Sequence, residues 1–227
     1  SSTPKETELM GLERDFLLAD LSRASYHASQ ITTKKSFLKI QELKSLGKNV
    51  SAGTSIHHLL FDETDIKNYR TFFKLRPPLR SNSDKLFLLQ NIKDSTLDTI
   101  SSFHLPQDEE SKRLPYEKAA FGAIGLQTLL PACLKLVNDK IIDLPQLFRK
   151  ISLNPAKILN IKSGILEEGY FADLVLFDPN KPLLIDRFNL LSKAKNTPFD
   201  GYQLFGEVLK TFVRGKEIYK SSNINDT

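Results

Sequence analysis

Helix-like and strand-like segments alternate along the first half of this sequence. Helical spacing of apolar residues occurs near residues 5–21, 33–47 and 83–93, and short strand-like runs occur near 23–29, 49–55 and 97–103. Strands that alternate with helices are joined by right-handed crossovers and lie side by side in a parallel sheet. The order of segments therefore predicts an α/β fold.

The helix expected at residues 5–21 carries five apolar residues that we place on one stripe: Leu9, Leu12, Phe16, Leu17 and Leu21. A stripe of this kind normally faces the core, while the charged residues between its members face water. The sequence therefore predicts an amphipathic helix that covers one side of the sheet.

The second half of the sequence has a different character. Residues 115–158 have helical spacing, and the prolines after Leu144 and Asn154 are well placed to open helices. Residues 164–220 contain short β-rich runs separated by Gly, Pro and Asp, with a turn expected at 178–180. We therefore expect a small sheet region after the helices, followed by a frayed tail at 223–227.

The composition limits the class of protein. Of 227 residues, 40% are hydrophobic and 26% are charged, which is typical of a globular protein. The net charge of +5 comes from basic residues spread along the chain, without the aromatic interleaving of a nucleic-acid platform. No apolar run approaches the roughly 20 residues of a membrane span, and the first residues lack a signal peptide's apolar core. We expect a cytoplasmic protein that binds neither nucleic acid nor membranes.

The single cysteine, Cys133, excludes an internal disulfide. It lies in LQTLLPACLKLV, among apolar residues at helical spacing. A reactive thiolate needs a polar, electropositive environment, so this setting favours a buried structural thiol over a nucleophile.

Candidate site residues follow from the strand order. In parallel sheets and barrels, ligands bind at the carboxyl ends of the strands. The segments expected there are Gln30, residues 55–58 and residues 103–107. These are the positions at which we expect any chemistry to reside.

Several phrases of the sequence resemble one family when they are taken in order. They are SYHASQITTKKS, VSAGTSIHHLLFDE, FKLRPPLRSNSDK, TISSFHLPQ, AAFGAIGLQTLLP and GILEEGYFADLVLFDP. Together they are similar to the C-terminal part of a bacterial dihydroorotase, in the amidohydrolase superfamily. The resemblance implies a TIM-like (β/α) barrel of the metal-dependent hydrolase type, with zinc at the carboxyl ends of its strands, and a small appended β-sandwich.

The resemblance also implies a division of the chain. Residues 1–160 would form the C-terminal part of the barrel, with only its last strands, and residues 161–222 the C-terminal share of the sandwich, before the tail at 223–227. The family's other strands and metal ligands would precede this part. Because open barrel edges and exposed apolar faces are costly, we expect an N-terminal segment outside this sequence.

The residues at the expected site depart from the family pattern. Gln30 stands where the family has a metal-binding His, and an amide oxygen is a poor substitute for imidazole on zinc. Phe103 stands where the family has an Asp that contacts metal and shuttles the proton to the leaving nitrogen, which a phenyl ring cannot do. Arg76 and Gln107 replace an Asn and a His that contact substrate, whereas His104 matches a family His. We therefore predict no catalytic residue and no metal ligand on this chain, with Arg76, His104 and Gln107 as the substrate-pocket equivalents.

The remaining polar residues have structural alternatives. His57 and His58 match an adjacent pair that does not bind metal in the family, and neighbouring residues on a strand point to opposite faces. His104 is expected to form structural hydrogen bonds, and His27 a core contact. Arg76 could hold an anion with its forked donors, but an ion pair with a nearby carboxylate is the more common arrangement.

Three functions remain open at this point. The first is a dihydroorotase-like pseudoenzyme of pyrimidine biosynthesis, without a cofactor, that acts as a structural or regulatory partner of aspartate carbamoyltransferase, as members of the family do, or of itself. The second is a zinc-dependent cyclic amide hydrolase, a dihydroorotase, whose missing ligands come from an N-terminal half. The third is a small-ligand sensor that uses Arg76 and Gln107 as polar anchors.

Overall fold

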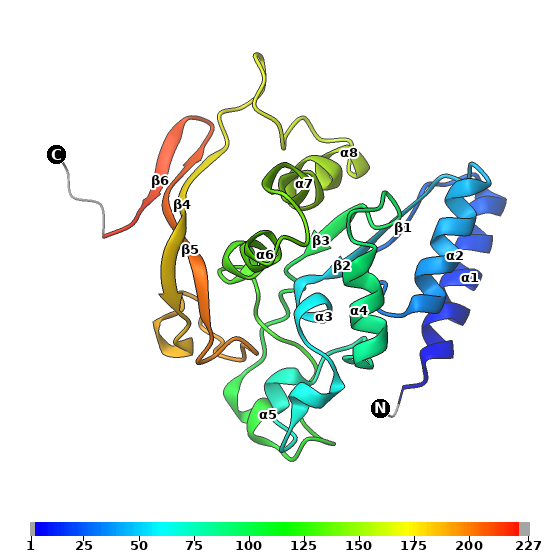
Figure 1. Cartoon of the computed structure of the whole chain (residues 1–227), viewed down its shortest axis with the longest axis horizontal. Coiled ribbons are helices and arrows are strands. Elements are labelled where there is room, and N and C mark those ends of the chain that lie inside the picture. Colours follow the sequence, from blue (N-terminus) through cyan, green and yellow to red (C-terminus); the bar gives the residue numbers. More distant parts are fainter. Residues whose placement is uncertain (1–2, 223–227) are drawn as a thin grey trace.

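The computed structural model describes residues 3–222, which form a parallel sheet and an antiparallel sheet (Figure 1). The parallel sheet has the order β1-β2-β3 and consists of β1 (Tyr26–Ala28), β2 (Val50–Ser55) and β3 (Thr99–Ser101). The antiparallel sheet consists of β4 (Leu174–Leu184), β5 (Gln203–Val213) and β6 (Lys216–Lys220). The parallel sheet predicted from the segment order is confirmed, although β1 and β3 are shorter than the sequence suggests.

Helices connect the parallel strands as expected. α1 (Lys5–Ser22) precedes β1, α2 (Lys34–Ser45) links β1 to β2, and α4 (Asn82–Gln90) lies between β2 and β3. The start of α2 follows from its N-cap, because the side chain of Thr33 accepts a hydrogen bond from the backbone N–H of Ser36.

The other helices are short. They are α3 (Ile56–Leu60), α5 (Glu109–Arg113), α6 (Leu129–Asn138), α7 (Leu144–Phe148) and α8 (Asn154–Ile158). Single turns of 3₁₀-helix lie at Glu63–Ile66, Thr71–Phe73 and Arg187–Asn189, and a π-helical turn, Arg149–Leu153, joins α7 to α8. α7 opens as predicted, with Pro145 in its first turn and a capping box between Asp143 and Gln146.

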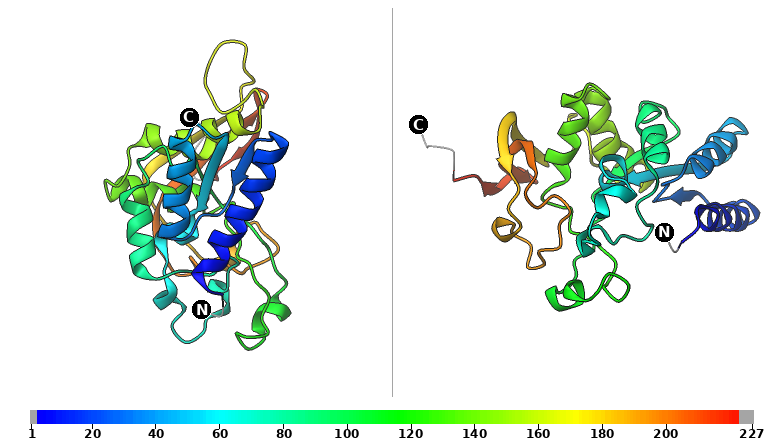
Figure 2. Two further views of the ribbon diagram at one scale, coloured as in Figure 1. Left: turned by 90° about the vertical axis from the view of Figure 1, so that its right-hand side faces the viewer. Right: turned by 60° about the horizontal axis from the view of Figure 1, so that its bottom comes forward.

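The parallel sheet lies between α1 and α2 on one side of the molecule and the antiparallel sheet on the other (Figures 1 and 2). α6 lies between the two sheets and packs against β5. The packing is close, because a Cβ atom built on Gly206 of β5 would lie 2.3 Å from Leu134 Cδ1 of α6. The second sheet is therefore fixed to the α/β part through a helix.

The core fills the space between the parallel sheet and its helices. Phe37 and Ile40 of α2 and Leu88 of α4 are fully buried, and Phe37 packs edge-to-face on Phe87 with ring centres 5.3 Å apart. Burial of each such side chain stabilises the fold by about 2 kcal/mol. Cys133 is also buried, in α6, and this burial raises the pKa of its thiol, in agreement with a structural role.

The predicted stripe on α1 is wrong. Leu12 is buried, but Leu17 and Leu21 are 58% and 75% exposed. At 3.6 residues per turn, positions five and nine residues after Leu12 lie on the opposite side of the helix. α1 therefore carries apolar residues on two sides, and only one of them packs on the rest of residues 3–222.

Two other local predictions are also wrong. Residues 115–128 are not helical, because Gly122 has a φ of +130° and its N–H donates to Lys74 O at 2.9 Å. The turn expected at 178–180 lies inside β4, where the pairing with β5 shifts register between Asp178 and Pro182. Asp178 Oδ1 accepts the N–H of Asn180 there, so the local turn chemistry produces a bulge.

The structure does not test the expected C-terminal tail or the expected domain boundary. The tail expected at 223–227 lies outside the described residues, and the domain boundary expected near residue 160 stays a prediction, although the second sheet starts at Leu174. Among residues 3–222, no helix is both long and apolar enough to cross a membrane.

Candidate functional site

The carboxyl ends of the parallel strands meet at one edge of the sheet, as predicted. Gln30 follows β1, Ser55 ends β2, and Ser101 ends β3. The side-chain Nε2 of Gln30 donates a hydrogen bond of 2.9 Å to Ser101 Oγ. The first and third strands are thus linked by side chains at the position where the relevant chemistry was expected.

Two buried oxygen atoms at this edge lack a hydrogen-bond partner among residues 3–222. They are Gln30 Oε1 and Thr54 Oγ1, the latter near the end of β2. Buried polar atoms are normally paired with protein or water, because an unpaired one costs about 1–3 kcal/mol. Both oxygen atoms can therefore accept further hydrogen bonds at this edge of the sheet.

Phe103 lies two residues beyond β3 and is partly buried. Its φ of +44° is left-handed, a conformation that costs a bulky L-residue about 1 kcal/mol. Its ring packs near His58, with the ring centres 6.3 Å apart. Phe103 supplies an apolar wall and no group that could carry a proton.

His57 and His58 lie in α3 rather than on a strand, which corrects the expectation that they point to opposite faces. The side chain of Ser55 caps this short helix, and both histidines are buried. The end of β2 thus turns directly into a helix that carries both rings inward.

His58 is held by two hydrogen bonds. Its Nε2 lies 3.1 Å from Pro77 O, so Nε2 carries the proton, and its Nδ1 accepts from Ser55 Oγ at 2.7 Å. Burial lowers the pKa of His58 to about 4. The ring is therefore neutral near pH 7 and is committed to the local structure.

His57 has a different environment. Its ring stacks on Phe199 with the centres 5.5 Å apart, and neither ring nitrogen has a partner among residues 3–222. Burial, followed by the nearby His58, lowers the pKa of His57 to about 3. His57 is therefore a neutral core residue.

His104 and Gln107 form hydrogen bonds with residues of other loops. His104 Nδ1 accepts N–H groups from Gly125 at 3.1 Å and Leu126 at 3.4 Å, so the structural hydrogen bonding expected for His104 is confirmed. The N–H of Gln107 lies 3.3 Å from Asn196 Oδ1, within the hydrogen-bonding limit.

The sequence did not single out Asn196. It is buried, and its Nδ2 donates to Gly122 O at 3.1 Å and to Leu105 O at 3.3 Å. Three chain segments thus converge on one amide side chain. The residues around it, KNTPF, carry no local signal that predicts these contacts.

Two buried lysines were also missed. Lys112 Nζ donates to Ala120 O at 2.8 Å and Gly122 O at 3.0 Å, and Lys74 Nζ donates to Glu117 O at 2.8 Å. Burial, and then the charge of Lys74, lowers the pKa of Lys112 to about 8. Both lysines fix the loop at 115–125 beside the site.

Arg76 does not form the expected ion pair. It is exposed, its guanidinium carbon lies 5.7 Å from the ring centre of Phe121, and no carboxylate within residues 3–222 lies within ion-pair distance of it. The arrangement is a cation–π contact, which leaves the guanidinium donors open to solvent.

Residues 3–222 do not form a complete zinc site on their own. Zinc is held by His, Cys and carboxylate side chains, usually at least three of them. Within residues 3–222 no group of three or more such side chains is arranged to hold a metal, and the positions expected to ligate it are Gln30 and Phe103.

Comparison with known proteins gives a consistent result. Residues 120–218 match the model of the amidohydrolase family. Dihydroorotases of Wolbachia sp. subsp. Drosophila simulans (strain wRi) and of Lactobacillus leichmannii are 37% and 39% identical to this chain. These matches cover 96% and 97% of this chain but only 49% and 52% of those proteins. The chain thus spans about half the length of the curated relatives it matches.

Solved structures are also matched over about half of their length. L-hydantoinase (dihydropyrimidinase) from Arthrobacter aurescens superposes with a TM-score of 0.93 at 26% identity, over 99% of this chain and 51% of that one. Dihydropyrimidinase from Brevibacillus agri NCHU1002 gives a TM-score of 0.88 at 25% identity, over 96% and 49%. The elements described above are therefore part of a TIM-like barrel with an adjoining sheet.

Proposed function

Because residues 120–218 match the amidohydrolase family and the chain matches dihydroorotases over about half of their length, we propose that it is a dihydroorotase-like protein of pyrimidine biosynthesis without hydrolase activity. The observation that carries this proposal is Phe103, which lies two residues beyond β3, where the proton-transfer group of the family would stand. Gln30, at the matching place after β1, supports it.

The chemistry explains why these two positions matter. Opening a cyclic amide requires an activated water and a proton for the leaving nitrogen. A benzyl side chain can neither take nor give that proton. The nearby imidazoles do not replace it, because His58 is held by Ser55 and Pro77 and His57 is enclosed against Phe199.

Turnover measurements test this proposal. The purified protein, supplied with zinc, is assayed for dihydroorotate hydrolysis, and its zinc content is measured by elemental analysis. We expect no turnover and no stoichiometric zinc. Turnover that tracks bound zinc would refute the proposal, whether or not the ligands come from this chain.

We further propose that the retained scaffold has a structural or regulatory role, as a partner of aspartate carbamoyltransferase. The support is indirect: the backbone superposes on an amidohydrolase with a TM-score of 0.93 although the expected site residues have changed. Mixing the two purified proteins should give a larger species by light scattering. Separation at micromolar concentrations would argue against this partner and leave self-association, which the same measurement detects in the protein alone.

A second candidate is a zinc-dependent dihydroorotase whose ligands come from residues outside this chain. The observation in its favour is Gln30 Oε1, which is buried and has no partner within residues 3–222, so it can accept a group from elsewhere. In that case zinc would bind to the full-length protein, and Gln30→Ala would lower the zinc content only if Gln30 Oε1 adds a ligand to those from outside this chain. An unchanged zinc content would remove Gln30 from the site.

A further inference from the structure

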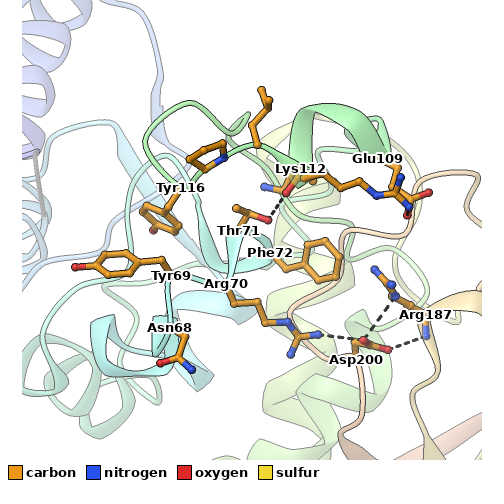
Figure 3. Close-up of a pocket in the computed structure, with 13 residues that line it drawn as sticks. Asn68, Tyr69, Arg70, Thr71, Phe72, Glu109, Lys112, Tyr116, Arg187 and Asp200 are labelled. Carbon is orange, nitrogen blue, oxygen red and sulfur yellow. Dashed lines mark hydrogen bonds and ion pairs between the residues drawn. The ribbon is translucent and has the colours of Figure 1, made fainter.

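A cavity of about 680 Å³ is lined by residues that lie outside the parallel strands and their carboxyl ends, and Figure 3 shows these residues. Cationic, acidic and aromatic side chains line it. The cations are Arg70, Lys112, Arg113 and Arg187, the acids are Glu109 and Asp200, and the rings are Tyr69, Phe72 and Tyr116. The cationic groups outnumber the carboxylates, so the lining has an excess of positive charge.

Asp200 is shared by two of the arginines (Figure 3). Its Oδ2 lies 3.0 Å from Arg70 Nη2 and 3.8 Å from Arg187 Nε, and its Oδ1 accepts the backbone N–H of Arg187 at 3.1 Å. Both guanidinium groups also lie 5.2 Å from the ring centre of Phe72. Both guanidinium groups thus pack on one ring, and a single carboxylate, which offsets only one of the two positive charges, contacts both.

Most donors of these arginines stay unused. A guanidinium has five N–H groups, and within residues 3–222 no side-chain acceptor other than Asp200 bonds the guanidinium of Arg70 or Arg187. The other carboxylate of the lining, Glu109, is paired with Arg113 at 2.7 Å. Lys112 Nζ is committed to two backbone carbonyls. The unused charged donors of the lining are therefore concentrated at Arg70 and Arg187.

We propose that this cavity binds a small oxyanion, a carboxylate or a phosphate group, through Arg70 and Arg187. Forked guanidinium donors match the planar geometry of such groups and retain their charge at every physiological pH. In the absence of ligand, Asp200 holds both arginines in position. Its carboxylate also competes with the anion for their donors. The inference is independent of hydrolase activity, because none of these residues lies at the strand ends.

The test is a titration of the full chain with acetate and with inorganic phosphate, at ionic strength kept constant with chloride, followed by calorimetry and thermal shift. We expect saturable binding and a rise in Tm. Arg187→Gln should weaken binding on the order of tenfold, since it removes charged hydrogen bonds. Arg14→Gln, an exposed site on α1, removes the same charge elsewhere and should leave binding unchanged.

Asp200→Asn provides a test in the opposite direction. It keeps the shape of the side chain but removes the competing charge, so binding of the anion should tighten. A purely structural role of the cluster predicts a loss of stability without tighter binding. If circular dichroism shows that Arg187→Gln is unfolded, Arg70→Gln takes its place. Absence of saturable binding by either anion, equal effects of Arg187→Gln and Arg14→Gln, or weaker binding by Asp200→Asn would each overturn the proposal.

Discussion

Gln30 and Ser101 are joined by a hydrogen bond of 2.9 Å that links the ends of β1 and β3 across β2. Ser101 Oγ in turn lies 3.4 Å from Thr54 O, on the strand between them. The side chain at position 30 is therefore part of the framework of the sheet. This contact gives Gln30 a structural role in the sheet.

A double-mutant cycle on this pair tests that role. Gln30→Ala, Ser101→Ala and the double variant are compared by urea unfolding, and we expect a coupling free energy of about 1 kcal/mol. Gln90, at the exposed end of α4, is the matched control, because Gln90→Ala combined with Ser101→Ala should show no coupling. Additive effects of Gln30→Ala and Ser101→Ala would contradict the prediction.

Local sequence patterns predicted how helices and parallel strands alternate along the chain, because each strand and its preceding helix have their own signals in the sequence. The N-cap Thr33 and the capping box at Asp143 are examples, since their partners lie three residues away. The predicted stripe on α1 was wrong for a geometric reason. A count of leucines includes apolar residues on opposite sides of the helix, and only their angular positions show that they do not share one side.

Long-range polar contacts could not be predicted. Asn196 bonds to residues 74 and 91 positions away, and nothing in its local sequence shows which carbonyls need a donor. The same holds for Lys112, a residue type that is normally exposed. The location of the site at the strand ends stays a prediction, and the contacts that support this edge come from loops that sequence patterns do not bring together.

Glu8 is predicted to anchor α1. Its carboxylate pairs with Arg80 at 3.3 Å, with both side chains less than a tenth exposed, and accepts the N–H groups of Thr32 at 2.9 Å and Thr33 at 3.1 Å. Removing one partner of a buried pair leaves an uncompensated charge, so Glu8→Gln should lower the free energy of unfolding by about 3 kcal/mol. Glu6→Gln, which breaks an exposed pair with Lys35, is the control and should cause no measurable change in urea unfolding. Equal effects of the two variants would contradict the prediction.

Two glycines should respond in opposite directions to alanine. A Cβ atom at Gly125 would lie 2.2 Å from Ser102 O and 3.2 Å from His57 Cε1, so Gly125→Ala should destabilise the fold by about 3 kcal/mol. Gly11 lies inside α1 with nothing within 4 Å of its Cβ position, so Gly11→Ala should stabilise by about 0.5 to 1 kcal/mol. Thermal and urea unfolding measure both effects, and a neutral Gly125→Ala would show that the loop at 122–126 can move.

The two buried histidines should make stability depend on pH. Burial lowers the pKa of His57 to about 3 and of His58 to about 4, whereas the ordinary value is 6.5, so below pH 6.5 the unfolded chain binds protons that the folded chain does not. Their contribution to stability is therefore complete above pH 6.5 and falls by about 1.4 kcal/mol per pH unit for each histidine as the pH drops toward 4. His57→Gln should reduce the slope of the unfolding free energy between pH 6.5 and 4.5. His27→Gln should reduce it less, because burial lowers the pKa of the half-buried His27 to a smaller extent. An equal slope in the wild-type protein and His57→Gln would mean that His57 is protonated, or reaches solvent, in the folded state.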